Sequence, residues 1–304
     1  MPKKKFHRPI FYALLRIVGV LFSLLPFDFA FNFGGAVGRF SFRILTKERK
    51  KTLAHLEAAF PEKTSKELKK IGEQVFENYG FIIAELGLLE KLIPRLKNDL
   101  TVEGREHFDA ARAKGNGVIA VTAHFSNWEL LGGWLAMSGY PGSVVARRIY
   151  YEKYDRLLVA TRAKMKLETI YRDESPRRIL KALHDNRVLG IVPDQDVDTV
   201  DGVFVDFFGK PAFTPSAPVR FAMTSGAPLV PCFLIREGKR YRIVIEPPIL
   251  IQDTGDKEKD LIANTQKWVS IQERYIRQYP HLWVWNHKRW KTLPAGRPGA
   301  PKTA

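Results

Sequence analysis

A histidine and a glutamate lie close together in residues 123–129, AHFSNWE, which follow a short apolar run. A carboxylate bound to an imidazole fixes its tautomer and stabilises the imidazolium, while the other ring nitrogen takes a proton from a hydroxyl. His124 and Glu129 are therefore a candidate general-base pair. On one helix they would point about 140° apart, so they can meet only if His124 precedes the helix. The alternative for His124 is a structural role.

The surrounding residues predict a strand, a turn and a helix. Residues 118–121 form a short apolar run, as expected of a buried parallel strand. Ser126 or Asn127 can cap a helix that begins near Trp128. Ligands of parallel α/β sheets bind at the carboxyl ends of the strands. The expected place of His124 is thus the place of a ligand site.

The composition indicates a folded protein with an anionic partner. The chain has 304 residues, of which 45% are hydrophobic and 12% aromatic, and this content excludes disorder. A formal charge of +17 points to nucleic acid, an acidic membrane surface or a phosphorylated substrate. The single cysteine, Cys232, allows no internal disulfide, which is typical of a reducing compartment. We expect Cys232 in the core.

The N-terminal residues favour the membrane among these partners. Residues 1–8 are basic, and residues 10–25 are almost continuously apolar but shorter than the roughly 20 residues of a membrane span. A signal peptide is the rival, but Arg16 interrupts the apolar run and no clear cleavage site follows. Basic residues beyond the run favour a cytoplasmic domain. We predict an uncleaved anchor in residues 1–45, spanning or interfacial; the alternative is an ordinary core helix.

The rest of the chain predicts an α/β fold, with a mostly parallel central sheet flanked by helices. Residues 46–92 have helical periodicity, with a capping box at Thr64 and Glu67 and an expected end at Pro94. The strands are expected at residues 100–103, 118–121, 143–146, 188–192, 229–235 and 241–245, the last two paired. Other expected features are helices at residues 105–113, 128–137, 154–165, 176–184 and 260–278, an aromatic turn at 204–209, an α/β domain over 46–293 and a disordered tail at 294–304.

Polar side chains follow three of these strands at the point where each strand ends. They are His124 with Glu129, the pair Arg147 and Arg148, and the run Asp194, Gln195 and Asp196. Because the carboxyl ends of parallel strands share one edge of a sheet, we expect these groups in one crevice. A base, an anion-binding pair and further carboxylates in one crevice make a catalytic constellation.

Several blocks together resemble a known family, the bacterial lipid A biosynthesis late acyltransferases of the lauroyl/myristoyl type. They belong to a wider group of glycerolipid and lysophospholipid acyltransferases whose signature is His-x4-Asp/Glu. The resemblance rests on AHFSNWE at 123–129, Arg147-Arg148, PDQD at 193–196, FVDFFG at 204–209 and YPHLWVWNHKRWK at 279–291. The chain departs from the family at Ala123, where many members have Asn, and near His281, where an acidic residue or Gln is more frequent. Both departures leave the exact acceptor open.

The resemblance implies an O-acyltransferase in which His124 deprotonates a lipid hydroxyl and Glu129 orients His124. The acyl donor would be a thioester of acyl carrier protein or coenzyme A, as a co-substrate, and no cofactor or metal is implied. Arg147 or Arg148 would bind a phosphate through charge-assisted hydrogen bonds. The alternative for these arginines is a surface salt bridge.

The same resemblance extends the candidate site. Asp194 would support His124 or an arginine, and Gln195 and Asp196 would help to bind substrate. The aromatic block supplies either core residues or the wall of an acyl-chain groove, and its members are Phe204, Phe207, Phe208 and Gly209. The tryptophans of the closing block suit a membrane-interface belt, or else a packed terminal strand; these are Trp283, Trp285 and Trp290.

The expected acceptor is an anionic, lipid A-type glycolipid; the alternative is a lysophospholipid or another glycolipid. We expect the enzyme at the cell inner membrane with its catalytic domain on the cytoplasmic side and without a nucleic-acid partner. Two rival functions stay open. A glycosyltransferase would use Asp194 and Asp196 to hold a metal–nucleotide-sugar. A non-catalytic basic protein would bind a membrane or nucleic acid and would not need His124.

Overall fold

Seven strands form the central sheet of the computed structural model, which describes residues 12, 19–20, 22–174 and 176–294. The strand order is β1-β9-β8-β2-β5-β3-β4, and all neighbours are parallel except β8 and β9. The strands are β1 Leu100–Glu103, β2 Val118–Val121, β3 Gly142–Ala146, β4 Leu167–Tyr171, β5 Val188–Ile191, β8 Leu229–Glu237 and β9 Arg240–Ile245. The predicted α/β class, the mostly parallel sheet and the β8–β9 pair are confirmed, whereas β4 was not predicted.

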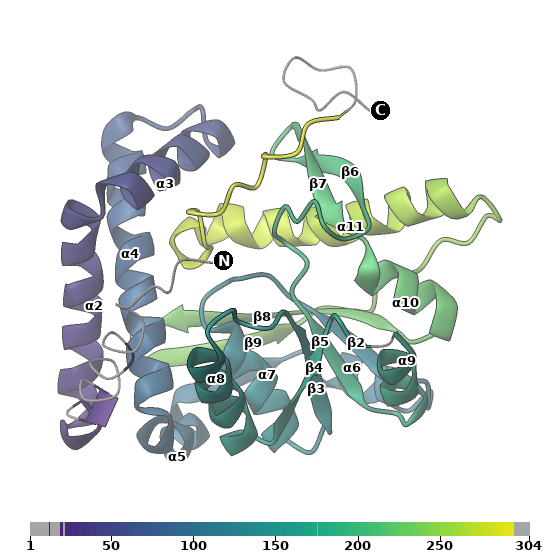
Figure 1. The fold of residues 1–304 in the computed structure, drawn as a ribbon, viewed down its shortest axis with the longest axis horizontal. Helices are drawn as coiled ribbons and strands as arrows, with labels where there is room; N and C mark the ends of the chain where they lie inside the picture. The colour runs from purple at the N-terminus through teal and green to yellow at the C-terminus, as the bar shows by residue number, and fades with distance from the viewer. Residues whose placement is uncertain (1–11, 13–18, 21, 175, 295–304) are drawn as a thin grey trace, which may run out of the picture.

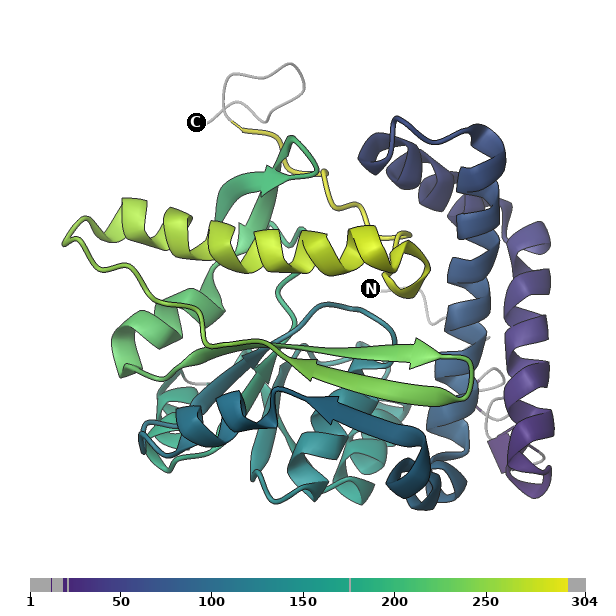
Figure 2. The same ribbon diagram turned by 180° about the vertical axis from the view of Figure 1, so that it is seen from behind.

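Helices flank the sheet on both faces and at one end. They are α2 Phe27–Ile44, α3 Thr46–Ala59, α4 Ser65–Gly87, α5 Leu89–Asp99, α6 Arg105–Arg112, α7 Trp128–Met137, α8 Glu152–Lys164, α9 Pro176–His184, α10 Ala217–Ser225, α11 Lys257–Gln278 and the short 3-10 helix η1 Pro280–Leu282. In Figure 1, α2, α3 and α4 stand together beside the sheet, and α11 crosses above the strands. The view from behind agrees (Figure 2).

Alternate residues of β2 enter two separate cores. Val118 and Ala120 pack with α5, α6 and α7 on one face of the sheet. Ile119 and Val121 pack on the other face with α3, α4, α10 and α11. Side chains of a strand alternate between its faces, and a strand covered on both faces is apolar throughout. This explains why the segment before His124 is a continuous apolar run.

Two predicted helix ends had different outcomes. The capping box is confirmed: the Thr64 hydroxyl accepts from the Glu67 backbone N–H, and the Glu67 side chain accepts from the Thr64 N–H. Pro94 does not end the preceding helix, because α4 stops at Gly87 and Pro94 lies inside α5. A proline removes one helical hydrogen bond, and here the burial of leucines on α5 offsets that loss.

The FVDFFG block is a hairpin rather than the predicted turn alone. Strands β6 Gly202–Phe207 and β7 Lys210–Pro215 pair antiparallel. Phe208 and Gly209 connect them with φ of 55° and 69°. Two positive φ values fit a tight hairpin whose twist matches the strands. The aromatic-turn prediction therefore covered only the middle of a longer element.

Helix α2 has apolar residues on two sides. Gly34 and Gly38 let it approach α4 so closely that a Cβ at Gly38 would lie 2.3 Å from the Phe76 carbonyl oxygen. The opposite side exposes large apolar side chains, namely Phe29, Phe33, Val37, Phe40 and Ile44. No helix in the described part of the chain combines the length and the apolar character that a bilayer crossing needs. Of the predicted anchor, residues 1–45, the structure describes 12, 19–20 and 22–45; the rest of the anchor, and residues 295–304 of the predicted tail, lie outside the described residues. The domain boundaries at 45 and 293 stay predictions.

Candidate active site

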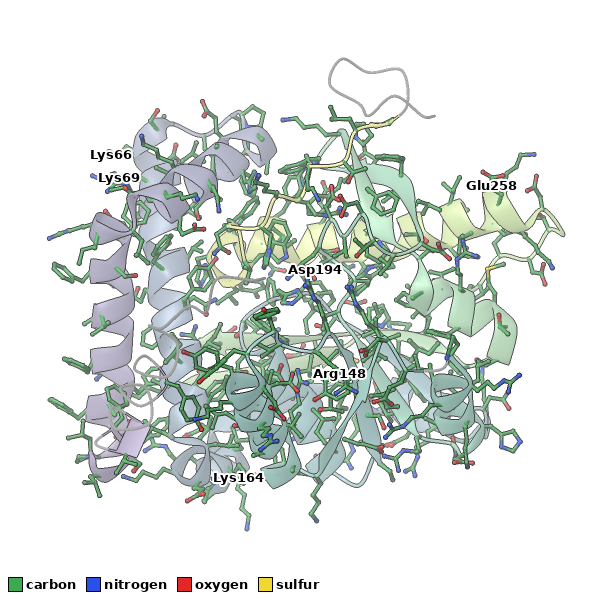
Figure 3. All side chains as sticks on the ribbon, in the orientation of Figure 1. Lys66, Lys69, Arg148, Lys164, Asp194 and Glu258 are labelled. Atoms are coloured by element: carbon green, nitrogen blue, oxygen red, sulfur yellow. The ribbon has the colours of Figure 1, made fainter. Side chains whose placement is uncertain are left out.

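The candidate active site lies where the neighbouring strands β2 and β5 end. Val121 and Ile191 are paired across these strands. His124 lies three residues after Val121, and Asp194 lies three residues after Ile191. The His124 Nδ1–H donates to Asp194 Oδ1 at 2.6 Å, and the His124 backbone N–H donates to Oδ2 at 2.8 Å. Trp283 Nε1 also donates to Oδ2, at 2.8 Å. Figure 3 shows Asp194 in the middle of the molecule, between the sheet and α11.

Asp194 is a buried carboxylate that stays ionised. Burial acts to raise the pKa of Asp194, but the charge of protonated His124 and hydrogen bonds from His124 and Trp283 outweigh burial and lower this pKa to about 2. A carboxylate on Nδ1 places the proton of neutral His124 there and leaves a lone pair on Nε2. The ring is thus oriented as a base directed away from Asp194.

The other side of the ring opens to a small polar cluster. The His124 side chain is 21% exposed, against 1% for Asp194. The Gln195 amide nitrogen lies 3.0 Å from Nε2 and 3.2 Å from Nδ1 of His124, so it packs over the face of the ring. It lies 2.9 Å from His287 Nε2 and can donate a hydrogen to it. Burial and the nearby His124 lower the pKa of His287, so it is neutral near pH 7. The edge of His124 faces Trp128, with ring centroids 4.8 Å apart.

This geometry suits proton abstraction from a hydroxyl. A hydroxyl that approaches Nε2 in the plane of the ring can pass its proton to that nitrogen. Asp194 then stabilises the imidazolium, because the ion pair is short and shielded from water. The Gln195 amide beside the ring can donate its hydrogens to the same substrate oxygen or to His287.

Glu129 has a different partner from the one predicted. Its two oxygens accept from Arg162 Nε and Nη2, both at 2.7 Å, and both side chains are buried. Arg162 Nη1 also donates to Thr169 at 3.3 Å, so the pair joins α7, α8 and β4. Within the described residues, Asp194 supplies the carboxylate on the His124 ring. The prediction that Glu129 orients His124 stays a prediction.

The two candidate arginines differ in their surroundings. Arg148 lies 3.7 Å from the centre of the Tyr171 ring and pairs with Asp173 at 3.2 Å and Glu174 at 3.5 Å. This arrangement matches the salt-bridge alternative. Arg147 is exposed, and no hydrogen bond or ion pair joins it to another residue in the described ranges. Figure 3 places Arg148 below Asp194 in that view.

The three aspartates that follow β5 have different binding partners. Asp194 binds His124, whereas Asp196 accepts from the backbone N–H and the hydroxyl of Thr292, at 2.7 and 2.6 Å. Asp198 pairs with Lys291 at 2.6 Å. Asp196 and Asp198 therefore fasten the closing block over the site. The described ranges contain no cluster of three His, Cys, Asp or Glu side chains arranged to hold a metal ion.

The aromatic candidates belong mainly to the core. Phe207 and Phe208 are buried, as are Trp283 and Trp285. The membrane-belt interpretation of the closing block is wrong for these two tryptophans; they pack beneath α3 and the hairpin, and Trp283 also holds Asp194. Phe204 instead lines an open groove between the β6–β7 hairpin and α11, of about 650 Å³.

An apolar cavity lies under the first turn of α7, between that helix and the sheet. Trp128 and Glu129 are at its edge, and its walls include Leu131, Val144 and Gly190. Its volume is about 40 Å³, which is room for about one or two water-sized groups. A longer apolar ligand enters only if the side chains of the walls move apart.

Sequence reasoning missed three members of this site. His287 and Trp283 were treated only as parts of the closing block, and Arg162 was not singled out. The signal for His287 was its place in NHKRW, where a histidine stands among basic and aromatic residues. No local pattern pairs Arg162 with Glu129, because the contact depends on how α8 packs against α7.

Comparisons with known proteins place the chain among bacterial lipid acyltransferases. The family model described as "Bacterial lipid A biosynthesis acyltransferase" matches residues 2–292. The chain is 29% identical over 291 residues to the lipid A biosynthesis lauroyltransferase of Escherichia coli, covering 92% of each chain. It is 24% identical over 302 residues to the lipid A biosynthesis palmitoleoyltransferase of the same organism, covering 96% of this chain and 95% of the relative. It is also 30% identical over 200 residues to a phosphatidylinositol mannoside acyltransferase of Mycolicibacterium smegmatis, covering 64% of each.

Proposed function

Because the chain belongs to the bacterial lipid A biosynthesis acyltransferase family, we propose that it transfers a fatty acyl group from a thioester to a hydroxyl of a lipid A-type glycolipid. The observation that carries this proposal is the His124–Asp194 pair at the carboxyl end of the sheet, with Nε2 directed away from the carboxylate. The acyl donor is acyl carrier protein or coenzyme A, which acts as a co-substrate.

His124 is the general base of the proposed reaction. Its Nε2 takes the proton of the acceptor hydroxyl, and the oxygen attacks the thioester carbonyl to form a tetrahedral intermediate. When the C–S bond breaks, the imidazolium returns the proton to the leaving thiolate. Asp194 holds the ring and its positive charge through both steps. The acyl group passes directly between substrates, so no serine or cysteine nucleophile is required.

Gln195 and Arg147 bind the substrates in this proposal. The Gln195 amide lies over the His124 ring, 3.0 Å from Nε2, and it can donate to the carbonyl oxygen as negative charge develops there. Arg147 offers a guanidinium without a protein partner in the described ranges, which suits a phosphate of the acceptor or the carrier. Arg172 follows the adjacent strand β4, whose last residue Tyr171 pairs with Ala146. The Arg172 backbone N–H donates to the Ala146 carbonyl, so a second cationic residue follows the neighbouring strand end.

Glu129 acts through Arg162 in this proposal. A buried arginine with a two-point carboxylate partner fixes the first turn of α7 against α8 and β4. That turn carries Trp128, which faces the His124 ring. Loss of Glu129 would therefore disturb the site through α7, and it would do so even without direct contact to His124.

The acyl chain is proposed to enter the cavity beneath α7. The cavity is apolar, has Trp128 among its lining residues and widens only if side chains move. At Gly190 an added Cβ would have no neighbour closer than 3.7 Å, so alanine fits there without strain. Gly190→Leu should fill the cavity and shift the products toward shorter chains, whereas Gly190→Ala should leave chain length unchanged. An unaltered product distribution in Gly190→Leu would place the acyl chain elsewhere.

The outer face of α2 is proposed to rest on the inner membrane, with the catalytic domain on its cytoplasmic side. Exposed aromatic and aliphatic side chains form this face, and exposed basic residues Arg39, Arg43, Lys47 and Lys50 accompany it. Figure 3 shows Lys66 and Lys69 at the same end of the helical layer. Apolar insertion and attraction to anionic lipid act together at such a surface. A Phe33→Ser/Phe40→Ser variant should bind anionic vesicles more weakly than the wild type while turning over detergent-dispersed substrate normally.

The decisive experiment offers purified enzyme several acceptors with acyl carrier protein or coenzyme A as the carrier. The acceptors are a lipid A precursor, a phosphatidylinositol mannoside and a lysophospholipid, and mass spectrometry identifies the products. We expect an ester-linked acyl chain on the lipid A precursor and none with His124→Ala. Exclusive acylation of another acceptor would reject the lipid A assignment but keep the chemistry. No product from any pair would reject the proposed function.

A further inference from the structure

A buried carboxylate on α4 reaches the turn that carries His124. Glu85 is fully buried, and one of its oxygens accepts from Asn127 Nδ2 at 2.8 Å. The other oxygen accepts from the Tyr241 hydroxyl at 2.9 Å and lies 3.1 Å from Arg236 Nε. Glu85 thus connects the helical layer, the strands β8 and β9, and the start of α7.

A second arm of the same network reaches the opposite side of the turn. Arg236 donates to the Asn78 side-chain oxygen, and Asn78 Nδ2 donates to the Leu282 carbonyl at 3.3 Å. The same carbonyl accepts from the Ser126 backbone N–H at 2.7 Å. The Arg236 guanidinium lies 4.3 Å from the centre of the Phe81 ring, which shields it from water.

The turn needs this support because its backbone is unfavourable on its own. Ser126 has a φ of 49°, in the left-handed region that residues with a side chain seldom adopt. The His124 carbonyl accepts from Val284 N–H at 3.2 Å, so the turn is also tied to the closing block beside Trp283. Both arms of the network therefore meet the segment that presents the His124 ring.

Asn127 is the point where the network can control the turn. Its Nδ2 donates to Glu85, while its Oδ1 accepts from the Leu130 N–H and caps α7. These two bonds fix the orientation of the amide. Asn127 Nδ2 and the Tyr241 hydroxyl both donate to the Glu85 oxygens, so Glu85 is an acceptor in this network. Burial raises the pKa of Glu85, and the charge of Arg236 offsets only part of that rise.

We propose that Glu85 is a positioning residue for the acyl transfer: it fixes the Asn127 amide and thereby the turn that aims His124 at the acceptor. This inference rests on the proposed function. A glutamine at position 85 would present an N–H₂ to one of the present donors. Where it faces Asn127, two N–H₂ groups meet, and a flipped Asn127 would no longer cap Leu130.

The test exchanges the hydrogen-bond donor and acceptor between Glu85 and Asn127. Glu85→Gln should lower kcat by about 10- to 100-fold and leave KM within about twofold, since substrate contacts are intact. Asn127→Asp should lower kcat as well, because it places a second carboxylate against Glu85. In the double variant Glu85→Gln/Asn127→Asp, the glutamine amide donates to an aspartate that still caps α7. We expect kcat within about threefold of the wild type.

Two further variants keep the test decisive. Asn127→Ser retains a helix cap but removes the donor to Glu85, so it should lose kcat like Glu85→Gln even if the latter fails to fold. Glu77→Gln is the matched control on α4, since Glu77 pairs with Arg39 near the surface, and its kcat should equal the wild type. All rates are measured below the lowest melting temperature in the set, together with the pH profile of kcat/KM.

The results separate this proposal from the proposed function. Glu85→Gln or Asn127→Ser with wild-type kcat and only a lower melting temperature would overturn the positioning role. A double variant no better than either single variant would do the same. If His124→Ala is inactive while Glu85→Gln is fully active, only this inference fails. If His124→Ala is active, the proposed function itself fails.

Discussion

Two buried carboxylates near His124 differ in how exposed their basic partners are. Glu129 forms a closed, two-point pair with Arg162, and both groups are buried. Asp194 is equally buried but holds a ring that is 21% exposed on its far side. A closed pair can only fix structure, whereas a pair with one open nitrogen can accept a proton from a ligand. Proton transfer therefore requires a ring nitrogen that stays open to a ligand, and a neighbouring acid alone does not provide it.

The same comparison shows that spacing in sequence does not determine which carboxylate binds His124. Glu129 is near His124 along the chain, but as the second residue of α7 it turns toward α8. Asp194 is far along the chain, but β5 lies beside β2 in the sheet and places it next to His124. Two further strands of the sheet intervene in sequence between β2 and β5, so strand order had to be known first.

The largest expected effect comes from the open pair. Asp194→Asn should lower kcat by about 10³–10⁴-fold, because the amide cannot stabilise the imidazolium and can favour the wrong tautomer. KM should change little, since Asp194 is buried behind the ring. Steady-state kinetics with a purified variant check this, and circular dichroism confirms the fold. A loss below tenfold would move the orienting role away from Asp194, and Glu129 would be the next candidate.

Substitutions in the Glu129–Arg162 pair should mainly lower the free energy of unfolding. Glu129→Gln leaves a buried arginine without its counter-charge, and we expect a loss of about 3–5 kcal/mol in the free energy of unfolding. Glu129→Leu/Arg162→Met should recover most of that loss, because it removes both charges. Denaturant titration measures both. If the double variant is stable but inactive, Glu129 has a role in catalysis beyond holding Arg162, as the sequence predicted.

Three half-buried histidines should make the stability of the protein sensitive to acid. Burial lowers the pKa of His55, His281 and His287 from the ordinary value. Each takes up a proton more readily when unfolded, so stability is fully present above about pH 6.5 and falls as pH drops below it. Each group contributes at most about 1.4 kcal/mol per pH unit. Unfolding titrations from pH 8 to 5 should show a smaller slope in His287→Gln than in the wild type; an equal slope would contradict this.

The smallest effects distinguish the two neighbouring arginines. Arg148→Met removes an exposed salt bridge and should change the free energy of unfolding by less than about 1 kcal/mol, with KM unchanged. Arg147→Met should leave stability unchanged and raise the KM of the phosphorylated substrate several-fold, since its guanidinium is unpaired within the described residues. The reverse pattern would assign the anion to Arg148.

Strand and helix positions were predictable where local chemistry decides them. The apolar run of β2, the Thr64 capping box and the Asn127 cap all depend on neighbours in sequence. The hairpin at Phe208 and Gly209 was underestimated, because its second strand contains Pro211 and Pro215, and prolines are rare inside strands. β4 was missed because Leu167–Tyr171 mixes polar and apolar residues at a sheet edge.

The residues of the candidate site that follow strands were predictable, but their pairing was not. His124, Asp194 and Gln195 follow strands, and a parallel sheet brings strand ends together. Which acid meets the ring depends on the neighbour relation of β2 and β5. Arg162, His287 and the Glu85 network depend on packing between elements far apart in the chain. No periodicity or motif encodes those contacts.

The most direct measurement is the single-turnover rate of acyl transfer by His124→Ala, with vesicle binding and melting temperature recorded on the same preparation. Loss of the imidazole should lower the rate at least as much as Asp194→Asn does, by about 10³–10⁴-fold, while membrane binding and melting temperature stay close to the wild type. A rate within a few-fold of the wild type in a folded, membrane-bound His124→Ala protein would contradict the account.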